Sequence, residues 1–149
     1  MPKRPHLATI ARSFSAAVVL LALVACTPRL LAPYDEVTDR SVSALQRQTE
    51  AHLIGLEAAA GTPDCVFDRH QRFYTDARIE ISALAVRTAA IPGNERTAEQ
   101  TTLLLASLDS LRQLHRLGCL APEQIAILRT QFNSSFTAIL RLELAKRRP

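Results

Sequence analysis

The stretch LLLASLDSLRQLHRL, residues 103–117, decides the fold of this chain, because its leucines recur at steps of three and four residues. Apolar side chains at these steps lie on one face of an α-helix. The stripe consists of Leu103, Leu104, Leu108, Leu111, Leu114 and Leu117. Gly118 suits the end of this helix. Its start is predicted near Asn94 or at Thr97, where Thr97-x-x-Gln100 matches a capping box.

Two further helices are predicted before this stretch. The first covers residues 33–60, with Pro33 at its first position, and Gly61 ends it. The second covers residues 62–91, with Thr62 as N-cap. The first helix has an apolar stripe of Val37, Val42, Leu45, Leu53 and Leu56. The second has a stripe of Phe67, Tyr74, Ala77, Ile81, Leu84 and Ile91, widened by Phe73, Ile79 and Val86.

A fourth helix is predicted from Pro122 to a basic end, Lys146-Arg147-Arg148. Its stripe consists of Ile125, Leu128, Phe132, Phe136, Ile139, Leu140 and Leu142. Four helices of similar length joined by short loops pack as antiparallel neighbours. The sequence therefore predicts an all-α, up-down-up-down four-helix bundle over residues 34–149. This topology brings the start of the first helix, the turn after residue 91 and the C-terminus to one end, and the other two turns to the far end.

The N-terminal residues have the three parts of a secretory signal. Lys3, Arg4 and Arg12 are basic, an apolar run covers residues 14–24, and the sequence Leu23-Val24-Ala25-Cys26 follows at its end. This arrangement resembles the lipobox of bacterial lipoproteins. The resemblance implies that residues 1–25 are removed by cleavage between Ala25 and Cys26, that Cys26 receives acyl chains such as palmitate, and that residues 26–33 form a lipidated tether.

Two other interpretations of the leader stay open. The apolar run could be an uncleaved membrane anchor, although roughly 12 residues fall short of the about 20 that span a bilayer. It could also be an ordinary signal peptide that leaves Cys26 free. Under the lipoprotein resemblance the chain is anchored at the periplasmic face of the cell envelope. Thr27, where an Asp would favour the inner membrane, then favours the inner leaflet of the outer membrane.

The same topology gives the basic tail two possible roles. Lys146, Arg147 and Arg148 fall at the end of the bundle next to the anchor, where anionic headgroups would attract them. They could equally form a solvated helix end that complements the helix dipole.

Cys65 and Cys119 are the two cysteines that remain beside Cys26, and the topology places both at the far end. A pair of cysteines in an oxidising compartment predicts a disulfide, and the alternative is two buried thiols. Cys119 and His115 could otherwise form a thiolate dyad across the helix end, which a disulfide would exclude.

Chemistry-bearing motifs are otherwise weak. His52, His70 and His115 all fall in the far half of the bundle, but no two of them share a helix at ligand spacing. No nucleophile elbow or phosphate-binding loop is present in the sequence. The leader contains no acidic residue, so the remainder has a net charge near +1, which does not favour nucleic-acid binding. We therefore expect no enzymatic activity, metal or cofactor.

One segment, residues 67–78, combines aromatic and charged side chains as interface hot spots do. Its candidate interface residues are Arg69, Arg72, Phe73 and Tyr74. The alternative is an aromatic core layer flanked by surface ion pairs, such as Asp68 with Arg72. The sequence as a whole indicates a membrane-anchored helical module that binds another envelope protein or acts structurally. The alternative is a ligand-binding or enzymatic module with its site at the far end. A dry aliphatic core would favour the first interpretation.

Overall fold

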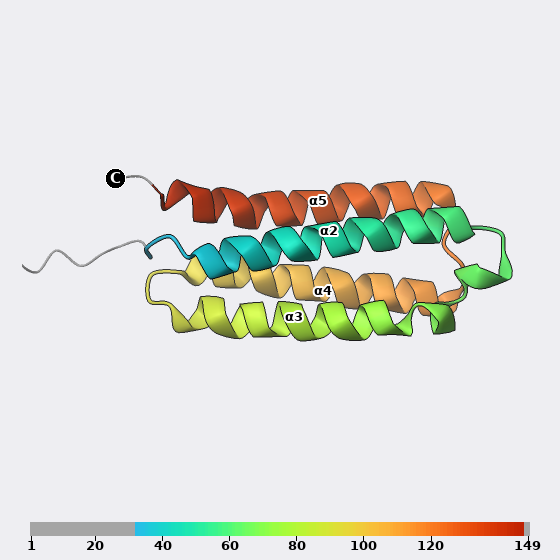
Figure 1. The fold of residues 1–149 in the computed structure, drawn as a ribbon, viewed down its shortest axis with the longest axis horizontal. Coiled ribbons are helices and arrows are strands. Elements are labelled where there is room, and N and C mark those ends of the chain that lie inside the picture. The colour runs from blue at the N-terminus through green and yellow to red at the C-terminus, as the bar shows by residue number, and fades with distance from the viewer. Residues whose placement is uncertain (1–31, 148–149) are drawn as a thin grey trace, which may run out of the picture. The chain divides into compact units, whose positions relative to one another are not determined.

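The computed structural model describes residues 32–147 (Figure 1). Its elements are α2 (Glu36–Ala59), η1 (Pro63–Cys65), η2 (Phe67–Arg69), α3 (Gln71–Ala90), α4 (Glu95–Leu117) and α5 (Pro122–Ala145). The four α-helices alternate in direction and form a bundle, which confirms the predicted all-α, up-down-up-down fold. The predicted signal peptide, Cys26, Thr27 and Arg148 lie outside the described residues. Within residues 32–147, no helix has the length and apolarity needed to cross a membrane.

Each helix contacts two neighbours: α2 and α4 both lie beside α3 and α5. The start of α2, the α3–α4 turn and the end of α5 meet at one end of the bundle (Figure 1), which we call the Ala32 end (residues 32–39, 87–97 and 143–147). The other two connections meet at the opposite end, which we call the disulfide end (residues 52–74 and 112–125). This is the arrangement that the sequence predicts.

Residues of the predicted stripes, together with Leu120, form an aliphatic and aromatic core. Its members are each less than 5% exposed: Val42, Leu45, Leu53, Leu56, Tyr74, Ala77, Ile81, Leu84, Leu104, Leu108, Leu111, Leu120, Ile125, Phe132, Phe136 and Ile139. Toward the Ala32 end the interior becomes polar, with Thr38, Thr88, Thr97, Thr101 and Glu143 at most 1% exposed.

Five residues assigned to the stripes are exposed instead: Val37, Ile79, Val86, Leu103 and Leu117, at 49% to 86%. On α3 the inward face contains Ala77 and Ile81. Because a step of two residues turns a helix by about 200°, Ile79 lies on the opposite, solvent-facing side. The predicted stripes were therefore wider than the faces that the helices bury.

The first helix begins later than predicted. Its first residue is Glu36 instead of Pro33. Asp35 is the N-cap, and its carboxylate accepts a hydrogen bond from the Val37 amide. Ala32 is only 4% exposed, and its amide donates to the Gly93 carbonyl at 3.0 Å. The bundle therefore includes Ala32, and the predicted boundary at residue 34 is wrong by two residues.

The predicted continuous helix over 62–91 is also wrong. Thr62 caps only the 3₁₀ turn η1, and the regular helix α3 begins at Gln71. The cause is tertiary: the Cys65 side chain is tied to Cys119, and the Cys65 carbonyl accepts from the His115 ring instead of from a helical amide. Local helix propensity is overridden by these two bonds.

The predicted capping box is wrong as well. The helix α4 begins at Glu95 after Asn94, so Thr97 lies inside it. Its buried hydroxyl donates to Glu143 of α5 at 3.1 Å. The preceding turn needs Gly93, whose φ of +76° is in the left-handed region that glycine adopts without strain.

Candidate functional site

The disulfide end is closed by a covalent bond. Cys65 of η1 and Cys119, after α4, form the predicted disulfide, with their Cα atoms 5.3 Å apart. The bond links residues separated by 54 positions in the chain. In this structure Cys119 has no thiolate to offer His115, so the proposed dyad does not exist in the oxidised protein.

His115 lies at the centre of this end and is 1% exposed. Its Nε2 donates to the Cys65 carbonyl, and its Nδ1 accepts from the Tyr74 hydroxyl, both at 2.8 Å. One donor and one acceptor define a neutral imidazole in a single tautomer. Burial lowers the pKa of His115, so the ring stays neutral and serves as a structural link.

His52 and His70 approach the same centre. The ring centroids of His52 and His70 are 5.3 Å apart, as are those of His70 and His115. His52 stacks on Phe73 with centroids 3.7 Å apart, and burial lowers its pKa to about 3, assisted by the two neighbouring histidines. His70 Nε2 donates to the Asp64 carbonyl at 2.9 Å. In the part of the chain that the structure describes, no three metal-ligating side chains are grouped closely enough to hold an ion.

The predicted interface residues separate into surface and interior. Tyr74 is 2% exposed, so its assignment to an interface is wrong: its hydroxyl belongs to the His115 link. Phe73 is half-buried against His52. Arg69 is exposed near Asp64 at 3.8 Å. Arg72 is exposed as well and pairs with Asp76 at 3.4 Å, not with Asp68 as suggested from the sequence.

An open hollow of about 530 Å³ lies between residues 66–71 and the last turns of α4. Its lining combines apolar and charged groups: Val66, Phe67, Asp68, Gln71, Arg112, His115, Arg116, Leu117, Gly118 and Cys119. The Arg116 guanidinium lies 5.5 Å from the centroid of the Phe67 ring. The Arg112 Nε is buried and has no hydrogen-bond partner among the described residues.

Arg112 and Arg116 were not among the site residues predicted from the sequence. A signal was present: two arginines lie one helical turn apart, and the nearest acidic residue on their helix is Asp109. The structure pairs Asp109 with Arg78 of α3. Neither arginine of the hollow has a carboxylate within 4.0 Å among residues 32–147.

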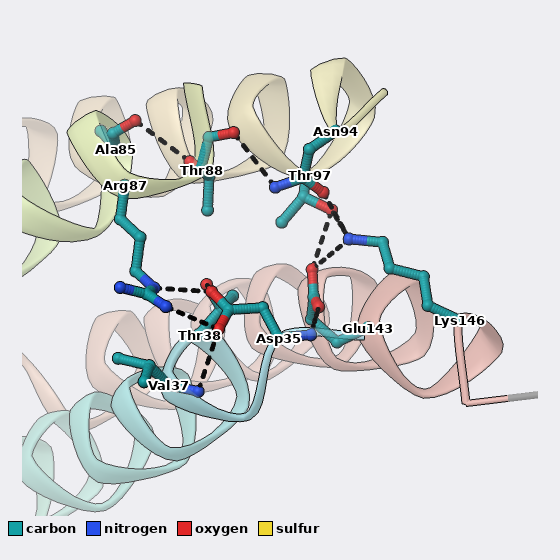
Figure 2. Close-up of polar contacts among 10 residues, drawn as sticks. All are labelled: Asp35, Val37, Thr38, Ala85, Arg87, Thr88, Asn94, Thr97, Glu143 and Lys146. Atoms are coloured by element: carbon teal, nitrogen blue, oxygen red, sulfur yellow. Dashed lines mark hydrogen bonds and ion pairs between the residues drawn. The ribbon is translucent and has the colours of Figure 1, made fainter. Parts of the chain in front are cut away.

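The Ala32 end contains a buried polar network, drawn in Figure 2. The Glu143 carboxylate is 0% exposed and receives the Lys146 ammonium at 2.5 Å, the Thr97 hydroxyl at 3.1 Å and the Asp35 amide at 3.3 Å. Lys146 also donates to the Asn94 side chain, whose amide donates to the Thr88 carbonyl at 3.1 Å. The network therefore joins the starts of α2 and α4 to the end of α5.

Lys146 is thus not a headgroup contact, and that prediction is wrong. Its side chain is 3% exposed, because it neutralises a carboxylate that the fold buries. Arg147 is 53% exposed, and it pairs with Asp39 at 3.1 Å while its guanidinium lies 4.3 Å from the centroid of the Tyr34 ring. Its contact with a membrane stays a prediction.

A second ion pair at the Ala32 end joins Arg87 to Asp35. Arg87 of α3 donates from two nitrogens to the two carboxylate oxygens of Asp35, at 2.6 and 2.7 Å (Figure 2). These hydrogen bonds, together with one from Thr38 at 2.8 Å, lower the pKa of Asp35 to about 2. The side chain of Asp35 therefore caps α2 and ties it to α3.

No protein-family model, curated protein or solved structure matches this chain. Its function is therefore inferred from the geometry of its own residues.

Proposed function

We propose that this chain is a lipid-anchored protein of the bacterial cell envelope that acts as a small helical adaptor and binds another envelope protein at the disulfide end. One observation carries the proposal: the Ala32 end pairs Asp35 with Arg87 and Glu143 with Lys146, whereas the hollow at the disulfide end contains two arginines that form no ion pair among residues 32–147. The core is filled by aliphatic and aromatic side chains, which favours an interaction module over an internal ligand site.

The proposed anchor would hold the bundle close to the membrane. Only residues 27–31 separate Cys26 from Ala32, and a span of six extended residues reaches at most about 22 Å. Ala32 is fixed by its bond to Gly93, and Asp35 by its bonds to Arg87 and Glu143. Since α2 has 24 residues, it is about 36 Å long. The disulfide end would then be presented away from the membrane.

The alternative is a ligand-binding or enzymatic module that uses the same hollow. A volume of about 530 Å³ is sufficient for a small molecule. Both nitrogens of His115 are already hydrogen-bonded, and Cys119 is oxidised. For this alternative we therefore propose that the hollow binds a small molecule without catalysing a reaction and without a cofactor.

In-cell photo-cross-linking tests the adaptor. A photo-reactive amino acid is placed at Leu117, which is 86% exposed at the disulfide end, and separately at Leu144, which is 48% exposed at the Ala32 end. We expect mass spectrometry to identify one envelope protein cross-linked through position 117 and not through position 144. Cross-linking of the same proteins through both positions, or of none, would contradict the proposal.

The anchor is tested separately by a Cys26→Ser variant. We expect the acylated N-terminus to be lost from the mass spectrum and the protein to leave the membrane fraction. A variant that stays with the membrane would exclude Cys26 as the anchor.

A further inference from the structure

We infer that the hollow beside the disulfide binds a carboxylate of a partner protein, carried by a short segment that also places an apolar side chain there. The inference rests on the proposed adaptor function and names the chemistry of the partner. It is carried by the juxtaposition of Arg112 and Arg116 with exposed apolar groups in one hollow.

The lining of the hollow contains two arginines and one acidic residue, so its net charge is positive. Its two arginines lie on successive turns of α4 and have no ion pair among the described residues. Asp68, the acidic residue of the lining, already accepts a hydrogen bond from Gln71 at 2.7 Å. Two guanidinium groups on one helix repel each other, and an anion between them would remove that repulsion. The hollow therefore favours an anionic ligand.

The Arg112 Nε is buried yet has no hydrogen-bond partner within residues 32–147, in contrast to most buried donors in proteins. The planar guanidinium presents its N–H groups as a fork that matches the two oxygens of a carboxylate. Arg112 lines the hollow, so a carboxylate bound there would accept hydrogen bonds from the guanidinium N–H groups that face it.

The lining also distinguishes among anions. Asp68 lies at the same hollow, so a dianion such as phosphate meets more repulsion there than a monoanionic carboxylate does. Val66 is 44% exposed and Leu117 is 86% exposed, and both line the hollow beside Phe67. These groups gain from covering by an apolar side chain. A peptide in which a carboxylate and an apolar residue are adjacent satisfies both requirements.

The two walls are held rigidly. Cys65 and Cys119 are bonded to each other, and the Cys65 carbonyl is bonded to His115 of α4. These bonds hold Cys65, the residue before the 66–71 wall, against the end of α4. A site whose walls are fixed before binding loses little conformational entropy when the ligand arrives.

Arginine-selective NMR of the full chain in detergent tests the inference, with the Arg112 Nε–H signal as the readout. The probe is an acetylated, amidated peptide of alternating Leu and Glu, and the controls are the same peptide with Gln in place of Glu and inorganic phosphate. We expect the Glu peptide to shift the Arg112 signal, and the Gln peptide and phosphate to bind at least about tenfold more weakly. Equal binding of the Gln peptide, or tighter binding of phosphate, would overturn the carboxylate assignment.

Matched variants locate the site. Arg112→Gln and Arg116→Gln should each weaken binding of the Glu peptide by about tenfold. Arg47→Gln, at an exposed position of α2, should leave it unchanged. Arg116 is exposed, so its variant keeps the test valid even where the Arg112 variant is destabilised. Unchanged binding by Arg116→Gln would contradict the site.

The same variants separate this inference from the proposed function. If the cross-linked partner is recovered through position 117 with wild-type yield in an Arg112→Gln/Arg116→Gln variant, the adaptor function stands and the carboxylate site is wrong. If wild-type protein recovers no partner, the adaptor function itself is wrong.

Discussion

The two ends of this bundle are closed by different chemistry. At the Ala32 end, the Asp35–Arg87 ion pair joins α2 to α3. Glu143, paired with Lys146 at the end of α5, accepts hydrogen bonds from Thr97 of α4 and from the Asp35 amide. At the disulfide end, a covalent bond ties η1 to the segment after α4, and the neutral chain from Tyr74 through His115 to the Cys65 carbonyl joins α3, α4 and η1. Arg112 and Arg116 take no part in these bonds. The charged groups drawn in Figure 2 at the Ala32 end are paired within the fold, whereas Arg112 and Arg116 at the disulfide end form no ion pair among residues 32–147.

The largest loss of stability is expected when the buried ion pair at the Ala32 end is broken. A Lys146→Met substitution leaves Glu143 buried without a cation, and such a loss costs about 3–5 kcal/mol of unfolding free energy. The double variant Glu143→Leu/Lys146→Met removes both charges and should recover most of that loss. Urea unfolding of the single and the double variant measures both changes in unfolding free energy. A single variant that loses less than about 1 kcal/mol would show that the network contributes little to stability.

Removing the disulfide tests the other end. A loop of 54 residues contributes about 4 kcal/mol in the chain-entropy model, and measured values usually fall below this, so we expect about 2–4 kcal/mol for Cys65→Ser/Cys119→Ser. Hydrogen exchange should increase first in residues 62–70, since these are held by the bond. Reduction of the wild-type protein is the matched control and should reproduce both changes. Unchanged exchange in this segment would mean that the His115 bond alone holds it.

Acid should weaken the disulfide end before the Ala32 end. His52 has a pKa of about 3 in the fold and near 6.5 when unfolded, so the unfolded state binds a proton that the folded state excludes between these values. Stability therefore falls as pH falls below 6.5, by about 1.4 kcal/mol for each pH unit and about 2 kcal/mol by pH 5. Burial of His115 acts in the same direction.

Urea unfolding at pH 7, 6 and 5 measures this dependence. The variant His52→Gln should show a slope smaller by about one proton, because the amide cannot be protonated in this range. A stability that does not change between pH 7 and pH 5 would mean that the histidines titrate alike in both states.

The sequence predicts most of the fold because hydrophobic periodicity and turn residues agree over three helices. Pro122 and Gly118 mark the bounds of α5 and α4 correctly, and the cysteine pair is placed at the correct end by topology alone. The region after Thr62 could not be predicted in the same way, since it is shaped by bonds to residues about 50 positions away. Local rules contain no information about such contacts.

The charged groups at the ends were only partly predictable. Glu143 follows Phe136 and Ile139 at seven and four residues, so it falls on the buried stripe of its own helix. A buried carboxylate requires a cation, and Lys146 stands three residues further on. That pattern could have revealed the network. The hollow beside Arg112 could not be predicted, because one of its walls is a 3₁₀ segment for which the sequence predicts a regular helix.

The smallest expected effect is the acid dependence of stability that Asp35 gives to the Ala32 end. The Arg87 hydrogen bonds lower the pKa of Asp35 from 3.8 to about 2, so their contribution to stability is complete above pH 4 and is lost as pH falls toward 2. The variant Asp35→Asn keeps an N-cap side chain but removes this dependence, which amounts to at most one proton. Carboxyl NMR titration of the wild-type protein gives the pKa directly. A value of about 4 would mean that the Arg87 pair is open in solution, and that the Ala32 end depends on Glu143 and Lys146 alone.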